Sequence, residues 1–110
     1  IHRDLKPENI LIKSLENIVI GDFGMSINKK TSKDIYGFHV QTMYYRAPEI
    51  FFKIDYDESI DIWSLGCIAY ELYWKKPLFK KNNNLNLFIE QNLILGHSSL
   101  IDRQSLMLAL

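Results

Sequence analysis

Apolar residues are grouped along the chain in a way that predicts a short β-hairpin near its start. Two β-branched runs, residues 10–12 and 17–20, are separated by the more polar residues 13–16, which favours two brief paired strands. Residues 28–37 are polar and show little periodicity, so we expect a mobile, solvent-exposed loop there. The first third of the chain is therefore predicted to be a hairpin followed by a loop.

Two helices are predicted in the middle of the chain. Pro48 can start a short helix that reaches residue 52, because proline is tolerated at the first helical position. Over residues 59–73, apolar side chains recur on nearly every face of a helix that Ser59 would cap. A helix that is apolar on most faces is expected to be buried.

The end of the chain predicts more helical structure. Apolar positions between residues 85 and 95 fit another helix, which Gly96 is expected to stop. Residues 97–110 are compatible with one more helix capped at Asp102, but this tail stays unassigned. The expected fold class is therefore mainly α with a short β-hairpin, in one partial domain over residues 1–110.

The composition limits the classes of protein and of partner. The 110 residues allow one small domain, and 47% of them are apolar, as in folded proteins. The formal net charge is zero, which removes the electrostatic argument for nucleic acid or an anionic membrane surface as partner. No apolar run approaches the roughly 20 residues that span a bilayer. We therefore expect a globular protein that binds neither nucleic acid nor a membrane.

The single cysteine bears on the cellular compartment. Cys67 has no second cysteine with which to form an internal disulfide, and its apolar neighbours predict a buried thiol. A reducing compartment fits, so we expect an intracellular protein of the cytoplasm or nucleus. The chain opens without Met and inside a motif, which indicates a piece of a longer protein.

Two loops carry an unusual density of side chains suited to catalysis. The first contains Asp4, Lys6 and Asn9 directly before the first predicted strand, and the second presents Asp22 directly after the second strand. Because a hairpin brings its two ends side by side, two carboxylates, an amide and an ammonium group are expected to converge.

This set of groups fits phosphoryl transfer, whose loose transition state needs positioning and charge neutralisation. Asp4 is suited to orienting the attacking hydroxyl, and Lys6 would offset charge on the transferred phosphate. Asp22 and Asn9 offer the hard oxygen ligands that Mg²⁺ prefers.

Three motifs, in order and spacing, resemble the signature set of eukaryotic-type protein kinases. They are His2-Arg3-Asp4 with Asn9, Asp22-Phe23-Gly24, and Ala47-Pro48-Glu49. The run that begins at Asp61 also fits this family. The segment from Lys6 to Asn9 resembles the corresponding segment of the serine/threonine branch of the family. The resemblance covers residues 1 to about 96, and it implies the C-terminal lobe of a kinase, from the catalytic loop to helix G.

The resemblance implies a role for each matching residue. Asp4 would be the catalytic base and Lys6 a phosphate contact, while Asn9 and Asp22 would be metal ligands, with ATP and Mg²⁺ as cofactors. Asp61 would brace the backbone of the catalytic loop from a buried helix. Structural roles are also implied for His2, Phe23, Gly24, Glu49 and Trp63.

A further run resembles one group of this family, the CMGC group of cyclin-dependent, mitogen-activated, dual-specificity Tyr-regulated and homeodomain-interacting kinases. This run extends from Gln41 to Ile50. In that group Arg46 is the position that shapes a pocket for proline after the phosphoacceptor, and Thr42 would hydrogen-bond Asp4 and Lys6. Gln41, Thr42 and Arg46 are therefore expected to form part of the substrate site.

Arg3 implies regulation through the activation loop. An arginine before the catalytic aspartate is typical of kinases in which a phosphate orders this loop. Gly37 and His39 stand where relatives carry the phosphorylated residues, so the usual switch residues are absent. Without a phosphate partner for Arg3, the intact kinase is expected to be constitutively ordered, activated by another protein, or poorly active. Candidate phosphosites remain at Thr31, Ser32 and Tyr36.

The predicted function is transfer of the ATP γ-phosphoryl group to Ser or Thr hydroxyls of a protein substrate, by a longer parent protein. The 110 residues contain no glycine-rich loop and no lysine strand to clamp the ATP phosphates, so this chain alone is expected to be inactive. The alternative is a non-catalytic scaffold or truncated kinase remnant that binds a substrate or a partner kinase. Asp4, Asn9 and Asp22 argue against a pseudokinase.

Overall fold

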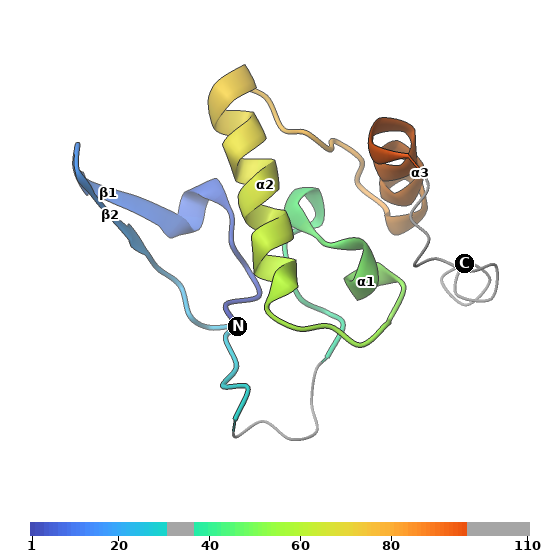
Figure 1. Ribbon diagram of the computed structural model, residues 1–110, viewed down its shortest axis with the longest axis horizontal. Coiled ribbons are helices and arrows are strands. Elements are labelled where there is room, and N and C mark those ends of the chain that lie inside the picture. Colours follow the sequence, from blue (N-terminus) through green and yellow to red (C-terminus); the bar gives the residue numbers. More distant parts are fainter. Residues whose placement is uncertain (31–36, 97–110) are drawn as a thin grey trace.

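The computed structural model describes residues 1–30 and 37–96, and its elements are arranged around one long helix (Figure 1). The hairpin extends to one side of this helix, and two further helices lie on the other side. The three candidate phosphosites at 31, 32 and 36 and the helix expected at Asp102 lie outside the described residues. In chain order the elements are the 3₁₀ turn Pro7–Asn9, strands β1 (Ile10–Ser14) and β2 (Asn17–Ile20), the 3₁₀ turn Met43–Tyr45, and helices α1 (Pro48–Phe51), α2 (Ser59–Trp74) and α3 (Asn84–Leu95).

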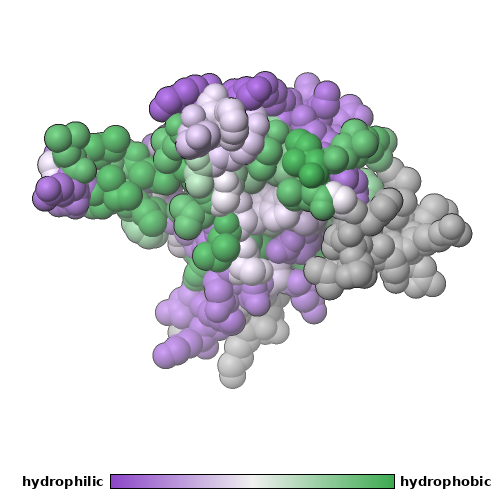
Figure 2. Space-filling model, turned by 45° about the horizontal axis from the view of Figure 1, so that its top comes forward, coloured by the Kyte–Doolittle hydropathy of each residue, from purple (hydrophilic) through white to green (hydrophobic). Residues whose placement is uncertain are grey.

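The predicted hairpin is confirmed. β1 and β2 pair antiparallel, with Ile10 opposite Ile20 at the end nearest α2. β1 continues to Ser14, two residues beyond the predicted run. The strands expose much of their apolar surface, with Leu11 at 53% and Ile18 at 63%, and the hairpin is a largely apolar projection in Figure 2.

α2 confirms the predicted long helix, but its predicted N-cap is wrong. Ser59 is the first helical residue, and Glu58 holds the cap position without a side-chain hydrogen bond. The carboxylate of Asp57 instead accepts the backbone N–H of Ser59 at 2.9 Å. An acidic side chain directly before the helix satisfies a free backbone donor and interacts favourably with the helix dipole.

The expectation that α2 is buried on most faces is also wrong. One side of the helix faces the core through Ile60, Ser64 and Cys67, whereas Ile62 is 67% exposed and Leu72 is 64% exposed. The physical reason is that the described residues cover only one side of α2. Across residues 1–30 and 37–96, none of the helices combines the length and apolar character that a membrane span needs.

Two clusters of buried side chains form the core. The larger joins the first loop to α1, α2 and α3, and the smaller joins the segment before α1 to α1 and the first turn of α2. The larger contains Leu5, Tyr45, Phe51, Phe52, Cys67, Ile68, Phe79 and Leu87, and the smaller contains Val40, Ala47, Ile50 and Ile60.

Cys67 lies in the larger cluster with 3% of its surface exposed, which confirms the predicted buried thiol. Burial raises the pKa of this thiol to about 12, because a thiolate is poorly solvated among apolar side chains. The reactive, deprotonated form is therefore disfavoured in the folded protein.

α3 starts and stops at residues that suit helix ends. Asn83, its N-cap, accepts the backbone N–H of Asn86 at 2.9 Å. Gly96 follows the last turn with a φ of 80° and donates to the carbonyl of Asn92, as predicted for the residue that stops the helix.

We expect Asn83→Ala to lower the free energy of unfolding by about 1 kcal/mol, because the N–H of Asn86 loses its side-chain acceptor. Denaturant-induced unfolding followed by circular dichroism measures this change. Asn82→Ala is the matched control, since Asn82 is an exposed neighbour outside the cap, and it is expected to leave the free energy unchanged. Equal destabilisation by both variants would contradict the role of the cap.

Candidate active site

A carboxylate of α2 holds the loop at the start of the chain. Asp61, in the first turn of α2, accepts the backbone N–H of His2 at 2.7 Å and that of Arg3 at 2.9 Å. Arg3 has a φ of 68°, in the left-handed region that non-glycine residues rarely adopt. The two charge-assisted hydrogen bonds stabilise this conformation and thereby orient the next residue, Asp4.

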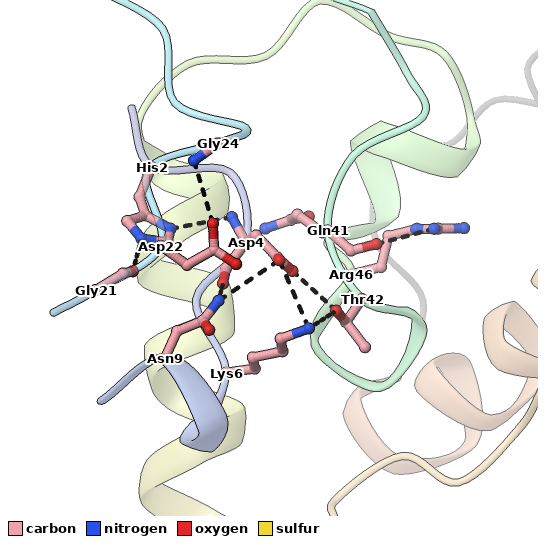
Figure 3. Close-up of polar contacts among 10 residues, drawn as sticks. All are labelled: His2, Asp4, Lys6, Asn9, Gly21, Asp22, Gly24, Gln41, Thr42 and Arg46. Carbon is pink, nitrogen blue, oxygen red and sulfur yellow. Dashed lines mark hydrogen bonds and ion pairs between the residues drawn. The ribbon is translucent and has the colours of Figure 1, made fainter. Parts of the chain in front are cut away.

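The carboxylate of Asp4 is held by two neighbours (Figure 3). The hydroxyl of Thr42 donates to Asp4 Oδ1 at 2.8 Å. Lys6 Nζ donates to the Thr42 hydroxyl oxygen at 3.1 Å and lies 3.6 Å from Asp4 Oδ2. The Asp4 side chain remains 15% exposed, so it is fixed in orientation and still accessible from solvent.

Asn9 lies at the end of the first 3₁₀ turn and is buried, with 7% exposure. Its amide nitrogen donates to the backbone carbonyl of Asp4 at 2.9 Å and lies 3.5 Å from Asp4 Oδ2. This orientation leaves the amide oxygen of Asn9 available, since no hydrogen bond from the described residues reaches it. A neutral carbonyl oxygen of this kind is a suitable ligand for Mg²⁺.

The loop that carries Asp22 is hydrogen-bonded to the loop that carries Asp4. The N–H of Gly21 donates to the carbonyl of Asn9 at 2.8 Å, and the carbonyl of Gly21 lies 2.9 Å from His2 Nε2. Because the N–H of Asp4 donates to His2 Nδ1 at 3.2 Å, the ring proton belongs on Nε2, which donates to Gly21. The imidazole of His2 therefore joins the two loops.

The Asp22 side chain lies beside the loop of Asp4 in Figure 3. Asp22 has a φ of 54°, and its Oδ1 accepts the N–H of Gly24 at 3.2 Å. A side chain at Gly24 would place its Cβ 3.2 Å from that oxygen and crowd the turn. Phe23 is 65% exposed and packs edge-to-face on His2 at 5.4 Å.

The donor set fits a cation that is shared with a bound phosphate. No group of three or more His, Cys, Asp or Glu side chains suited to a metal occurs in the part of the chain that the structure describes. Asp22 and Asn9 instead offer one carboxylate and one carbonyl oxygen. Mg²⁺ is commonly held by one or two such groups together with substrate phosphates.

Arg46 and Gln41 form a second rigid unit next to Thr42. Gln41 has a φ of 62°, and its backbone N–H donates to the carbonyl of Arg3 at 2.9 Å. Arg46 donates to the carbonyl of Gln41 at 2.9 Å and to that of Val40 at 3.2 Å. Burial lowers the pKa of the Arg46 guanidinium from its ordinary value.

The side chain of Gln41 anchors this unit to α2. Its amide nitrogen donates to the hydroxyl of Ser64 at 2.9 Å, and its amide oxygen accepts the N–H of Ala47 at 2.8 Å. Ser64 is fully buried and donates to the carbonyl of Tyr45 at 2.8 Å. Ser64 is not among the site residues that the sequence predicts. A small polar residue among the apolar positions of a buried helix face was the available signal.

Tyr45 makes a further link that the sequence did not predict. Its hydroxyl donates to Glu71 of α2 at 2.6 Å. Burial, and then the bond to the Glu71 carboxylate, raise the pKa of the Tyr45 hydroxyl above its ordinary value. The hydroxyl is therefore held protonated as the donor of this bond.

Two residues with implied structural roles, Glu49 and Trp63, lie elsewhere. Both line a mostly apolar cavity of about 570 Å³ along α2, together with Leu95. Trp63 stacks on Phe79 at 5.9 Å. Within the described residues, no hydrogen bond joins Glu49 or Trp63 to the groups around Asp4, so any effect they have on the site is indirect.

The loop of Asp4 and the loop of Asp22 together contain the groups that proteins of the phosphoryl-transfer class place around their substrates. The family model described as protein kinase domain matches residues 1–105. The chain therefore belongs to the protein kinase domain family, as its motifs predicted. Its two-stranded sheet and helices fit a part of that fold.

The names of individual relatives place the similarity of this chain within the CMGC group of kinases, also as predicted. Over 78% of the chain, the sequence is 52% identical to a probable dual specificity protein kinase YAK1 homolog of Encephalitozoon cuniculi. It is 40% identical to a cyclin-dependent kinase 4 homolog of Caenorhabditis elegans over 76% of the chain, and 40% identical to an extracellular signal-regulated kinase 1 of Candida albicans over 93%. The chain spans only 21%, 20% and 26% of these three relatives.

Proposed function

We propose that this chain is the C-terminal lobe, from the catalytic loop to helix G, of a serine/threonine protein kinase. The observation that supports this most is the Asp4 carboxylate, held between Thr42 and Lys6 and still accessible. A carboxylate fixed in this way can orient an attacking hydroxyl and accept its proton. Membership of the protein kinase family supports the same reaction.

In the proposed mechanism, each residue acts on the phosphate or on the substrate hydroxyl. Mg²⁺-ATP, when bound, supplies the γ-phosphoryl group and a cation that offsets its charge. Asp22 and Asn9 would hold that cation through their side-chain oxygens. Asp4 accepts the hydroxyl proton at Oδ2, because Oδ1 already accepts the Thr42 hydroxyl. Lys6 stabilises negative charge beside Oδ2.

Arg46 and Gln41 support a preference for proline directly after the phosphoacceptor. The guanidinium of Arg46 donates a hydrogen bond to the carbonyl oxygen of Gln41. This bond makes the carbonyl a poor acceptor for a backbone N–H of a bound peptide. Proline has no N–H, so a peptide with proline there loses no hydrogen bond. The proposed substrate is therefore a protein with Ser or Thr followed by Pro.

The chain alone is proposed to be inactive, because positioning provides most of this catalysis and its sequence lacks the groups that clamp ATP. The active form would be a longer intracellular parent protein that acts on a protein substrate. An activating protein is a further proposed partner, and one relative is itself named a cyclin-dependent kinase homolog. Neither nucleic acid nor a membrane is proposed as a partner.

A peptide assay with the parent protein tests this function. Phosphate transfer from Mg²⁺-ATP is measured for matched peptides that contain Ser-Pro, Ser-Ala or Tyr-Pro. We expect kcat/KM for Ser-Pro to exceed that for Ser-Ala by about tenfold or more, with no transfer to Tyr-Pro and none after chelation of Mg²⁺. Arg46→Lys keeps the charge but loses the planar fork that reaches Val40 and Gln41, so it should reduce the preference for Ser-Pro.

The outcomes separate the parts of the proposal. Transfer to none of the peptides by a folded parent would contradict the kinase proposal and favour a scaffold that binds a substrate or a partner kinase. Transfer to the Tyr peptide would contradict the serine/threonine assignment, and equal transfer to Ser-Pro and Ser-Ala would contradict the preference for proline.

A further inference from the structure

The guanidinium of Arg3 is bound by neutral groups of the chain itself. Its Nε donates to the carbonyl of Met25 at 2.6 Å, and its Nη1 donates to the hydroxyl oxygen of Tyr56 at 3.0 Å. The Tyr56 hydroxyl in turn donates to the carbonyl of Gly37 at 2.8 Å. One hydroxyl therefore connects Arg3 to the segment that leads to Gln41.

Tyr56 is itself held in place by packing. Its ring meets Phe38 edge-to-face at 5.9 Å, and it packs against the smaller core cluster, which includes Ile50 and Ile60. The ring therefore has little freedom to turn away, and the hydroxyl is positioned before any ligand binds. The entropy lost on forming its two hydrogen bonds is correspondingly small.

The backbone of Arg3 connects this arrangement to the candidate active site. Its N–H is bound by Asp61 and its carbonyl by the N–H of Gln41, and Asp4 follows it directly. A displacement of the Arg3 side chain would therefore be transmitted both to Asp4 and to Gln41, which precedes Thr42. Arg3 is thus a junction between the two halves of the site.

We propose that Tyr56 is a positioning residue that orders Arg3 and the segment 37–41 without a phosphate. A phosphate beside an arginine acts through charge-assisted hydrogen bonds that it accepts. The Tyr56 hydroxyl accepts from Arg3 in the same manner, but it also donates to the carbonyl of Gly37, which a fully ionised phosphate cannot do. The effect on activity rests on the proposed kinase function, whereas the ordering of the segment does not.

The test compares Tyr56→Phe with wild type in the full-length parent protein. This change removes the hydroxyl and keeps the ring against Phe38. Tyr73→Phe is the matched control, because Tyr73 lies on α2 with 76% of its surface exposed and its ring contact with Trp74 is retained. Amide hydrogen exchange of Gln41, peptide phosphorylation before and after phosphatase treatment, and thermal unfolding are measured for all three proteins.

We expect Tyr56→Phe to speed exchange of the Gln41 amide and to lower kcat, each about tenfold, the size of effect expected when a charged group loses a hydrogen bond. Wild type and Tyr73→Phe should keep their activity after phosphatase treatment, and α3 should exchange at the same rate in all three. Unchanged exchange at Gln41 in Tyr56→Phe, or loss of wild-type activity after phosphatase treatment, would overturn the proposal. If wild type phosphorylates no peptide, the kinase proposal fails, and the exchange measurement alone decides the role of Tyr56.

Discussion

Replacing Asp4 with asparagine is expected to lower kcat for peptide phosphorylation by about 10²–10⁴-fold, the range associated with loss of a general base. An amide cannot accept the proton of the attacking hydroxyl at neutral pH. The NH₂ group of the asparagine would also face hydrogen-bond donors and find no acceptor among them. Lys6 Nζ lies 3.6 Å from Asp4 Oδ2, and the amide nitrogen of Asn9 lies 3.5 Å from the same oxygen.

The measurement is steady-state transfer from Mg²⁺-ATP to a Ser-Pro peptide by the parent protein. KM for ATP is expected to change little, because Asp22 and not Asp4 is assigned to the cation. Asp55→Asn makes the same atomic change at an exposed position and should leave kcat unchanged. A wild-type rate in Asp4→Asn would show that Asp4 is not the base, even if the parent is an active kinase.

The candidate site was predictable from the sequence as far as its chemistry is local. Asp4, Lys6 and Asn9 lie within one loop, and the hairpin that follows this loop brings Asp22 close to it. The strand runs that define the hairpin are short, but their β-branched residues and the polar residues between them gave its position. The loop that enters the first strand of a hairpin and the loop that leaves the second strand lie close together in any fold that contains the hairpin.

Contacts between distant parts of the chain were not predictable in the same way. Tyr56 and Arg3 are 53 residues apart in sequence, and Ser64 and Gln41 are 23 apart. Tyr56 lies in an acidic stretch without periodicity, so nothing in the sequence distinguishes it from a solvated tyrosine. The left-handed φ values of Arg3 and Gln41 were equally hidden, because neither residue type favours that conformation.

The error about α2 has a related cause. The apolar residues around a helix indicate how much of its surface is suited to burial. They do not predict which element covers each face. Ile62 and Leu72 have that character and remain exposed, because the described residues pack on the opposite face. The same apolar pattern includes Ile60, Cys67 and Ile68, which are buried on the face of α2 that the core covers.

Replacing Asp61 with alanine is expected to destabilise the protein by about 2–4 kcal/mol, since each of two hydrogen bonds to a charged group contributes roughly 1.5–3 kcal/mol and partial hydration recovers some of it. The backbone N–H groups of His2 and Arg3 would lose their shared acceptor. Arg3 would then be free to leave its φ of 68°, a conformation that is unfavourable for a residue with a side chain. Denaturant-induced unfolding of wild type and variant measures the difference in free energy.

The loss should not be confined to stability, because the two N–H groups lie immediately before Asp4. At a temperature where Asp61→Ala is still folded, kcat is expected to fall while KM for the peptide changes less. The base is misplaced directly, whereas Gln41 loses at most its bond to the Arg3 carbonyl and keeps its side-chain bonds to Ser64 and Ala47. Asp61→Asn should be intermediate, because its amide oxygen can accept only one of the two N–H groups well and its NH₂ then faces the other. Asp55→Ala, at an exposed position, controls for the removal of one negative charge. If Asp61→Ala matched Asp55→Ala in both stability and kcat, the Asp61 carboxylate could not be what holds the loop of Asp4 in place.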